Sequence, residues 1–253
     1  MNKDELEKIK QKALEEHIPI IMDDTLDVIA NILTEKKPKR ILEIGAAVGY
    51  SAMCFSEYLV EGGVIDTIER DENRIKEAKQ NFKKVEVENK INLYEGDAVE
   101  ILPTLSEKYD VVFIDAAKGK YPFFLKEALR MLNDNGVILA DNILYKGYVM
   151  SDYNKHKQRT AVRNLREYIK ETTEDPNLKT EILEVGDGLA ISWKRLIIWE
   201  KGTVLFSHFF CHFTKKAYLI CFGLSQFPNF GKREPSPFPF FYIYMYFFIV
   251  DFK

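Results

Sequence analysis

Short apolar segments alternate with longer amphipathic segments between residues 40 and 140. The apolar segments are four or five residues long, and they are Ile41–Ile44, Val64–Ile68, Ile91–Tyr94, Val111–Ile114 and Val137–Ala140. Segments with helical periodicity lie between them, at Ser51–Tyr58, Asp71–Phe82, Ala98–Leu102 and Pro122–Leu132. Apolar strands this short, separated by helices, are typical of a parallel sheet that helices cover on both faces.

The segments on either side of this region complete the predicted fold. Two helices are expected before it, at Lys3–Glu16 and Thr25–Thr34. After it, Thr180–Glu184 and Leu189–Trp193 flank a Gly-Asp-Gly sequence, which predicts two strands in an antiparallel hairpin. We therefore expect an α/β fold in one domain over residues 1–195. Its seven-stranded sheet is doubly wound and mostly parallel, with the hairpin at its C-terminal edge.

Residues 196–253 differ from the rest of the chain in composition. They hold 18 of the 33 aromatic residues and four prolines, with no clear periodicity. Their net charge is +3, whereas residues 1–195 carry −6. We interpret this tail as an appendage outside the fold. Our leading hypothesis is translation out of frame or by read-through, and the alternative is an extension that associates with a membrane or a partner.

Cysteine content and the N-terminal sequence bear on the compartment. Residues 1–195 contain one cysteine, Cys54, so no disulfide framework can form there, which fits a reducing compartment. The charged N-terminal helix lacks the apolar core of a secretory signal. The longest apolar stretch, Phe240–Val250, has eleven residues, and about 20 are needed to span a bilayer. We expect a cytoplasmic protein without a membrane span.

A glycine-rich turn follows the first predicted strand. Gly45 and Gly49 are separated by three residues, and Ala47 stands where a dinucleotide fingerprint has its middle glycine. This spacing argues against NAD and for a smaller ligand that lacks a pyrophosphate. A glycine pair at this place can also be only a tight turn between strand and helix, so the pair by itself indicates little.

Two acids at the ends of later strands strengthen the prediction of a nucleoside ligand. Glu69 ends the second strand, 20 residues after Gly49, where its carboxylate can accept hydrogen bonds from both hydroxyls of a ribose. Asp97 follows the third strand, where it can meet an adenine edge. Ligands of open α/β sheets bind at the carboxyl ends of the strands, and all of these residues lie there.

Three further polar residues, Asp115, Asp141 and Asn142, follow the fourth and fifth strands. Because neighbouring strand ends bring them together, we expect two carboxylates and an amide to hold Mg²⁺, with positions left for water and substrate oxygens. A single Asp at a strand end is more often a helix cap or a turn residue. The combination with the predicted nucleoside site is what favours metal binding.

Two segments, Ile114–Tyr121 with the sequence IDAAKGKY and Ala140–Asn142 with the sequence ADN, resemble the metal-dependent, catechol-type O-methyltransferase family. The resemblance covers about residues 1–195 and implies a class I methyltransferase fold, S-adenosylmethionine as cofactor and Lys118 as general base. Within the family the chain is most similar to bacterial tRNA 5-hydroxyuridine methyltransferases, through Asp141–Gly147 and Val185–Ser192. Together with the glycine-rich turn, the resemblance places the cofactor against Ile21, Glu43, Gly45, Ser51, Glu69, Asp97, Ala98 and Asp115.

The predicted site favours a chelating hydroxyl as substrate. A cation bound to a hydroxyl lowers the pKa of that hydroxyl and orients it toward the methyl donor. A 5-hydroxyuridine has a hydroxyl beside a ring carbonyl, so it can chelate a cation as a catechol does. A small catechol- or hydroxycinnamoyl-type molecule is therefore the alternative substrate to tRNA. A cofactor-binding scaffold without activity is disfavoured, because all three metal residues are present.

One predicted helix carries a basic face. Arg159, Arg163, Arg166 and Lys170 recur at helical spacing, and apolar residues such as Val162 occupy the opposite side. We expect this face to contact tRNA phosphates beside the active site. The acidic net charge of residues 1–195 favours the alternative, a solvated surface helix. We also expect a homodimer that forms through the N-terminal helices.

Overall fold

The computed structural model describes residues 1–152 and 158–195, together with the backbone of residues 199–200 and 203–204. The chain divides into two units, Met1–Ser207 and His208–Lys253, and the second unit lies outside the described residues. In the tail at residues 196–253 the structure describes the backbone of residues 199–200 and 203–204, and our hypotheses on this tail stay predictions.

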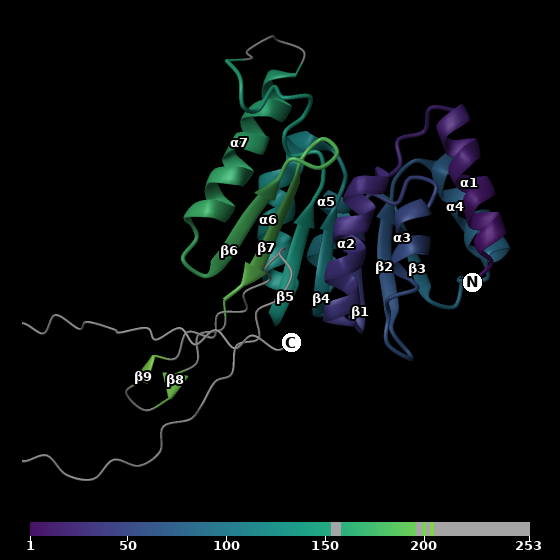
Figure 1. Cartoon of the computed structure of the whole chain (residues 1–253), viewed down its shortest axis with the longest axis horizontal. Helices are drawn as coiled ribbons and strands as arrows, with labels where there is room; N and C mark the ends of the chain where they lie inside the picture. The colour runs from purple at the N-terminus through teal and green to yellow at the C-terminus, as the bar shows by residue number, and fades with distance from the viewer. Residues whose placement is uncertain (153–157, 196–198, 201–202, 205–253) are drawn as a thin grey trace, which may run out of the picture. The chain divides into compact units, whose positions relative to one another are not determined.

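A seven-stranded sheet runs through the first unit (Figure 1). Its strands are β1 (Arg40–Ile44), β2 (Val64–Glu69), β3 (Ile91–Glu95), β4 (Tyr109–Ile114), β5 (Leu132–Ala140), β6 (Leu178–Leu183) and β7 (Leu189–Lys194). They are ordered β3-β2-β1-β4-β5-β7-β6. Strands β1 to β5 are parallel, and β7 is antiparallel to both β5 and β6. This sheet confirms the predicted doubly wound fold with its C-terminal hairpin.

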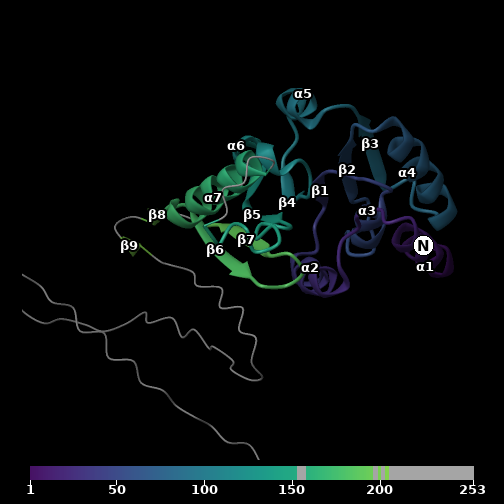
Figure 2. The ribbon, with the colours of Figure 1, turned by 90° about the horizontal axis from the view of Figure 1, so that it is seen from above.

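Helices cover both faces of the sheet, as the view from above shows (Figure 2). One face packs against α1 (Lys3–Glu15), α2 (Asp23–Lys36), α3 (Tyr50–Phe55) and α4 (Glu72–Val85). The other face packs against α5 (Ala98–Ile101), the 3₁₀ turn η1 (Leu102–Thr104), α6 (Tyr121–Met131) and α7 (Arg159–Glu174). A second 3₁₀ turn, η2 (Lys118–Lys120), leads into α6. The two helical layers therefore bury both faces of the parallel strands.

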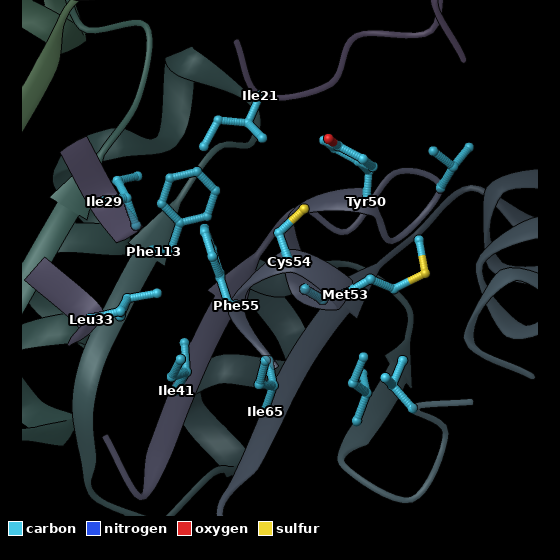
Figure 3. Packing of buried hydrophobic residues seen from close by; sticks show 14 of the residues in the cluster. Ile21, Ile29, Leu33, Ile41, Tyr50, Met53, Cys54, Phe55, Ile65 and Phe113 are labelled. Carbon is cyan, nitrogen blue, oxygen red and sulfur yellow. The ribbon is translucent and has the colours of Figure 1, made fainter. Parts of the chain in front are cut away.

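Alternation along each strand divides the side chains between two cores. In β1, Ile41 points to the α1–α4 side and Leu42 to the α5–α7 side. On the first side, Phe55 of α3 meets Phe113 of β4 edge-on, with 5.2 Å between the ring centroids. Figure 3 shows Ile29 of α2 beside these two rings. The packing fixes α3, which begins at the glycine-rich turn.

The second core holds α7 against α6. The ring of Tyr168 in α7 lies edge-on to that of Tyr121 in α6, 5.5 Å between centroids, and both residues are fully buried. Strand β6 is parallel to β5, because each is antiparallel to β7. Since α7 directly precedes β6, the N-terminal end of α7 lies at the edge where the parallel strands end. Figure 1 shows this end of α7 on the same side as the β6–β7 turn.

A few element boundaries differ from the predicted ones. The helix predicted at Ala98–Leu102 is shorter and continues as the turn η1, because Pro103 has no N–H with which to continue an α-helix. Beyond the main sheet, β8 (Trp199–Glu200) and β9 (Thr203–Val204) pair with each other only. Among the helices that the structure describes, none has the length and apolar character to cross a bilayer.

The turn between β1 and α3 requires glycine at residue 45. Gly45 has a φ of +105°, and a Cβ atom there would lie 2.1 Å from the carbonyl oxygen of Asp115. The N–H groups of Gly45 and Ala46 both donate to the carbonyl of Ile68, at 3.1 and 3.0 Å. The end of β1 is thereby fixed beside the ends of β2 and β4.

This close approach makes a stability prediction. Gly45→Ala should lower the free energy of unfolding by roughly 3 kcal/mol, because backbone must move and the residue is strained at positive φ. Gly62→Ala is the matched control: its φ is +72°, but a Cβ atom there meets nothing within 4 Å. That variant should lose only about 1 kcal/mol. Equal losses in urea unfolding would contradict the steric argument.

Candidate active site

A cavity of about 610 Å³ opens at the carboxyl ends of the parallel strands. Its walls come from the turns that follow these strands, from the connection between α1 and α2, and from the β6–β7 turn. All the predicted cofactor and metal residues except Glu43 line this cavity, and so does the predicted base. They are Ile21, Gly45, Ser51, Glu69, Asp97, Ala98, Asp115, Lys118, Asp141 and Asn142. The structure thus brings residues from six segments of the sequence to one site.

Glu69 organises the part of the cavity next to β2. Its Oε2 accepts a hydrogen bond from the N–H of Ala47 at 2.8 Å. Its Oε1 accepts from the N–H groups of Arg70 and Asp71, at 2.8 and 2.9 Å. Ala47 has a φ of +45°, which is unusual for a residue with a side chain. The carboxylate therefore stabilises the glycine-rich turn, and Oε2 can still accept a hydrogen bond from a ligand hydroxyl.

Asp97 both caps a helix and lines the cavity. Its Oδ1 accepts from the N–H of Val99 at 2.9 Å, which makes Asp97 the N-cap of α5. Its Oδ2 lies 3.6 Å from Nη1 of Arg70, and 44% of the side chain is exposed. The helix-capping and ligand-binding interpretations of this residue are therefore compatible, since each can use its own oxygen.

Glu43 is the predicted cofactor residue that the structure does not bring to the cavity wall. It is fully buried, with Oε1 accepting from Oγ of Ser51 and Oε2 from Oγ1 of Thr67, both at 2.5 Å. Glu43 lies on the same side of β1 as Ile41, so it points under α3. Burial raises the pKa of Glu43 to about 7, and the two hydroxyls offset this only in part. We therefore correct its role to orienting Ser51.

The part of the cavity next to β4 and β5 holds a charged cluster around Lys118. Its Nζ donates to Oδ1 of Asp115 at 2.7 Å and to Oη of Tyr121 at 2.9 Å, and lies 3.4 Å from the carbonyl oxygen of Asp141. The N–H of Asp115 donates to Ile44 and that of Asp141 to Ile114, each at 3.0 Å. These bonds continue the ladders past the strand ends and hold the two acids on neighbouring strands.

The chemistry of this cluster fits a divalent cation. Burial first, and repulsion from Asp115 second, raise the pKa of Asp141 to about 7. Asn142 has a φ of +54°. Its backbone N–H donates to Oδ1 of Asp141, but its side-chain amide makes no hydrogen bond within the described residues. Residues 1–152 and 158–195 contain no metal-suited group of three or more His, Cys, Asp or Glu. A cation here would therefore need the amide oxygen of Asn142 as well as the two carboxylates.

Comparison with known proteins places the chain in a family. Residues 3–195 match the family model described as O-methyltransferase. The chain belongs to this O-methyltransferase family. Tapetum-specific methyltransferase 1 of Arabidopsis thaliana is 31% identical over 186 residues, which are 71% of this chain and 78% of the relative. Family membership confirms the predicted class of enzyme, an S-adenosylmethionine-dependent O-methyltransferase.

Solved structures of similar proteins share the fold. A Staphylococcus aureus protein described as a putative caffeoyl-CoA O-methyltransferase superposes with a TM-score of 0.70 at 34% identity, covering 75% of this chain and 91% of that one. The SAH-bound methyltransferase PaMTH1 of Podospora anserina superposes with a TM-score of 0.57 at 26% identity, covering 77% of this chain and 97% of that one. The sheet is therefore that of class I methyltransferases, as predicted.

Sequence reasoning missed two residues of this O-methyltransferase site. Tyr121 is fully buried, its Oη donates to the carbonyl of Asp141 at 2.7 Å, and burial raises its pKa well above the ordinary value. Its position at the end of the IDAAKGKY motif, three residues after Lys118, was the available signal. Asp187 lines the cavity and accepts from the N–H of Lys146 at 2.6 Å. The sequence indicated for Asp187 only a turn between two strands.

The four residues of the basic face of α7 are exposed, but they differ in the contacts that they make. The guanidinium of Arg166 donates to the carbonyls of Tyr148, Val149 and Ser151, so it supports the loop before α7. Arg159 and Arg163 form no ion pair with the described residues. All three arginines line a surface hollow of about 640 Å³, so the predicted tRNA contact of Arg166 stays a prediction. Lys170 lies about 16 Å further along the helix from Arg159.

The buried carboxyl of Glu43 makes a pH prediction. Its folded pKa, about 7, lies above the ordinary glutamate value of 4.5, so the folded state binds the proton more tightly than the unfolded state. Stability from this group is therefore present at low pH and is lost as pH rises toward 7. Between about pH 5.5 and pH 8 the loss should be about 2 kcal/mol.

Glu43→Gln should remove this part of the pH dependence, because Gln can bond both hydroxyls without titrating. The measurement is urea unfolding of the wild type and the variant at both pH values. An unchanged difference between the two pH values in the variant would show that Glu43 does not titrate in this range.

Proposed function

We propose that this enzyme transfers a methyl group from S-adenosylmethionine to a hydroxyl that lies beside a second oxygen in its substrate. One observation carries the proposal: the amine of Lys118 lies against Asp115 and Asp141 in the same cavity that holds Glu69 and Asp97. A candidate base, two acids for a cation and two acids for a nucleoside therefore share one space.

The cofactor would lie along the ends of β1, β2 and β3. Oε2 of Glu69 would accept a hydrogen bond from a ribose hydroxyl, and Oδ2 of Asp97 would accept from the adenine amino group. Ser51, oriented by Glu43, and the turn at Gly45 would hold the methionine part. Ile21 and Ala98 would supply apolar contact. S-adenosylmethionine, when bound, supplies the electrophilic methyl group, and the SAH-bound relative from Podospora anserina supports this choice of cofactor.

Asp115, Asp141 and Asn142 would hold the divalent cation, with Mg²⁺ as the proposed ion. When bound, the cation supplies positive charge that makes a neighbouring hydroxyl more acidic. After Nζ of Lys118 has released one of its three protons to water, the neutral amine would accept the proton of the substrate hydroxyl, and Tyr121 and the carbonyl of Asp141 hold that amine in place. The hydroxyl oxygen would then bond to the methyl carbon that the cofactor supplies as the bond from sulfur to that carbon breaks, which would give a methyl ether and S-adenosylhomocysteine.

The substrate that we propose is the wobble 5-hydroxyuridine of tRNA, which would become 5-methoxyuridine. The support is the resemblance of Asp141–Gly147 and Val185–Ser192 to tRNA-modifying members, and two arginines at the strand-end edge that form no ion pair within the described part of the chain. The second candidate is a small catechol- or caffeoyl-type molecule, which the Staphylococcus aureus relative favours. A homodimer through α1 and α2 and a cytoplasmic location also stay predictions.

Methylation assays with the full chain distinguish these substrates. The chain is incubated with S-adenosylmethionine and Mg²⁺, and with either tRNA that carries 5-hydroxyuridine or catechol. Nucleoside mass spectrometry should show 5-methoxyuridine, with kcat/KM much higher for tRNA, and chelation of the metal should stop the reaction. Efficient methylation of catechol alone would overturn the tRNA proposal and leave the reaction class intact.

Lys118→Ala tests the proposed base. The variant should lower kcat by about 10²- to 10⁴-fold, because no other side chain replaces the proton acceptor. The Kd for S-adenosylmethionine, measured by calorimetry, should change less than about twofold. The matched control is Lys120→Ala, an exposed lysine in the same turn. A wild-type kcat for Lys118→Ala would exclude Lys118 as the base.

The arginines of α7 test tRNA contact. Replacing both Arg159 and Arg163 with Glu should lower kcat/KM for tRNA by at least about 100-fold, because two phosphate contacts become repulsive. The Kd for S-adenosylmethionine should not change, because neither arginine lines the cavity. Arg166→Ala should instead lower thermal stability by loosening the loop that it supports. Unchanged tRNA methylation in the Glu variant would show that this face does not bind tRNA.

A further inference from the structure

Helix α7 contacts the turn that carries the proposed base. The side-chain Nδ2 of Asn164 donates to the carbonyl oxygen of Gly119 at 2.6 Å, across 45 residues of sequence. Gly119 directly follows Lys118 within η2. We infer that Asn164 is a positioning residue, which fixes η2 so that Nζ of Lys118 reaches its place in the cavity. The inference rests on the proposed role of Lys118 as the base.

The turn η2 has little support of its own. It is a 3₁₀ turn of three residues, and its local backbone bond runs from the N–H of Lys120 to the carbonyl of Ala117, at 2.9 Å. Short 3₁₀ segments have poorer hydrogen-bond geometry than α-helices. The three contacts of Lys118 Nζ all lie at the far end of a flexible side chain. The bond from Asn164 to the backbone of η2 therefore helps to fix the position of the Lys118 backbone, from which that side chain extends.

Helix α7 is well suited to provide this bond, because it is firmly anchored. Val162, Leu165 and Tyr168 of α7 are all buried in the second core. The ring of Tyr168 packs against Tyr121, whose hydroxyl accepts a hydrogen bond from Lys118. One helix thus holds the base from two directions, through the backbone of η2 and through the aromatic residue that contacts Nζ.

The bond also has a defined geometry. Asn164 is half-buried, and its Oδ1 accepts from Nε of Arg163 at 3.3 Å, which directs Nδ2 toward Gly119. A Cβ atom added at Gly119 would come into van der Waals contact with Cγ2 of Thr160, at 3.9 Å, so the first turn of α7 also lies beside η2. Loss of the amide would leave the carbonyl of Gly119 without this donor and η2 free to shift.

The test is Asn164→Ala in the full chain, with the proposed substrate, Mg²⁺ and S-adenosylmethionine. We expect kcat to fall about tenfold, since one hydrogen bond is lost and the reacting groups are displaced slightly. The Kd for S-adenosylmethionine should stay the same, because Asn164 does not line the cavity. The matched control is Thr173→Ala, which removes a side-chain bond to the carbonyl of Ile169 on the same helix and should leave kcat unchanged.

A double-mutant cycle with Lys118→Ala shows whether Asn164 acts through the base. If it does, Asn164→Ala should cost nothing further in the Lys118→Ala background. Additive losses, or a wild-type kcat for Asn164→Ala alone, would overturn the inference and leave the proposed function standing. A wild-type kcat for Lys118→Ala alone would instead overturn the proposed base, and the positioning role with it.

Discussion

The close contact between Gly45 and the carbonyl of Asp115 is the constraint on which the rest of the site depends. Because Gly45 has no side chain, the turn after β1 can lie directly against the end of β4. That contact joins two regions with different chemistry: the glycine-rich turn held by Glu69, and the charged cluster around Lys118. A larger residue at position 45 would separate them, and a methyl donor and an activated hydroxyl react only when they are held within van der Waals reach.

Two buried carboxyl groups of the site make the fold less stable when they are charged. Burial raises the pKa values of both Glu43 and Asp141 to about 7, so in their charged forms both acids oppose folding. Hydrogen bonds from two hydroxyls offset part of the cost of burying the charge of Glu43. The N–H of Asn142 and the positive charge of Lys118 do the same for Asp141. The remaining repulsion between Asp115 and Asp141 is the kind that a bound cation removes. Binding of the proposed cation would therefore raise folding stability through Asp115 and Asp141.

The fold was predictable because its central strands are mostly buried on both faces and mostly apolar, so their number and order along the chain could be recognised. Glu69, Asp97, Asp115 and Asp141 could be assigned because a strand end has a known place in a parallel sheet. The buried position of Glu43 could also have been predicted, because Glu43 lies on the same face of β1 as Ile41. Arg166 could not be resolved in this way: helical spacing gives the face of a residue, but not the carbonyls that a preceding loop brings to it.

The acidic charge of residues 1–195 does not argue against a polyanionic substrate as strongly as the sequence suggested. Charges are screened over about 8 Å at physiological ionic strength, so the net charge of a domain says little about one edge of it. At the N-terminal end of α7, Arg159 and Arg163 form no ion pair with the described residues, whereas Glu69 and Asp141 line the cavity. The substrate question therefore depends on the local arrangement around α7, while the reaction depends on the strand ends.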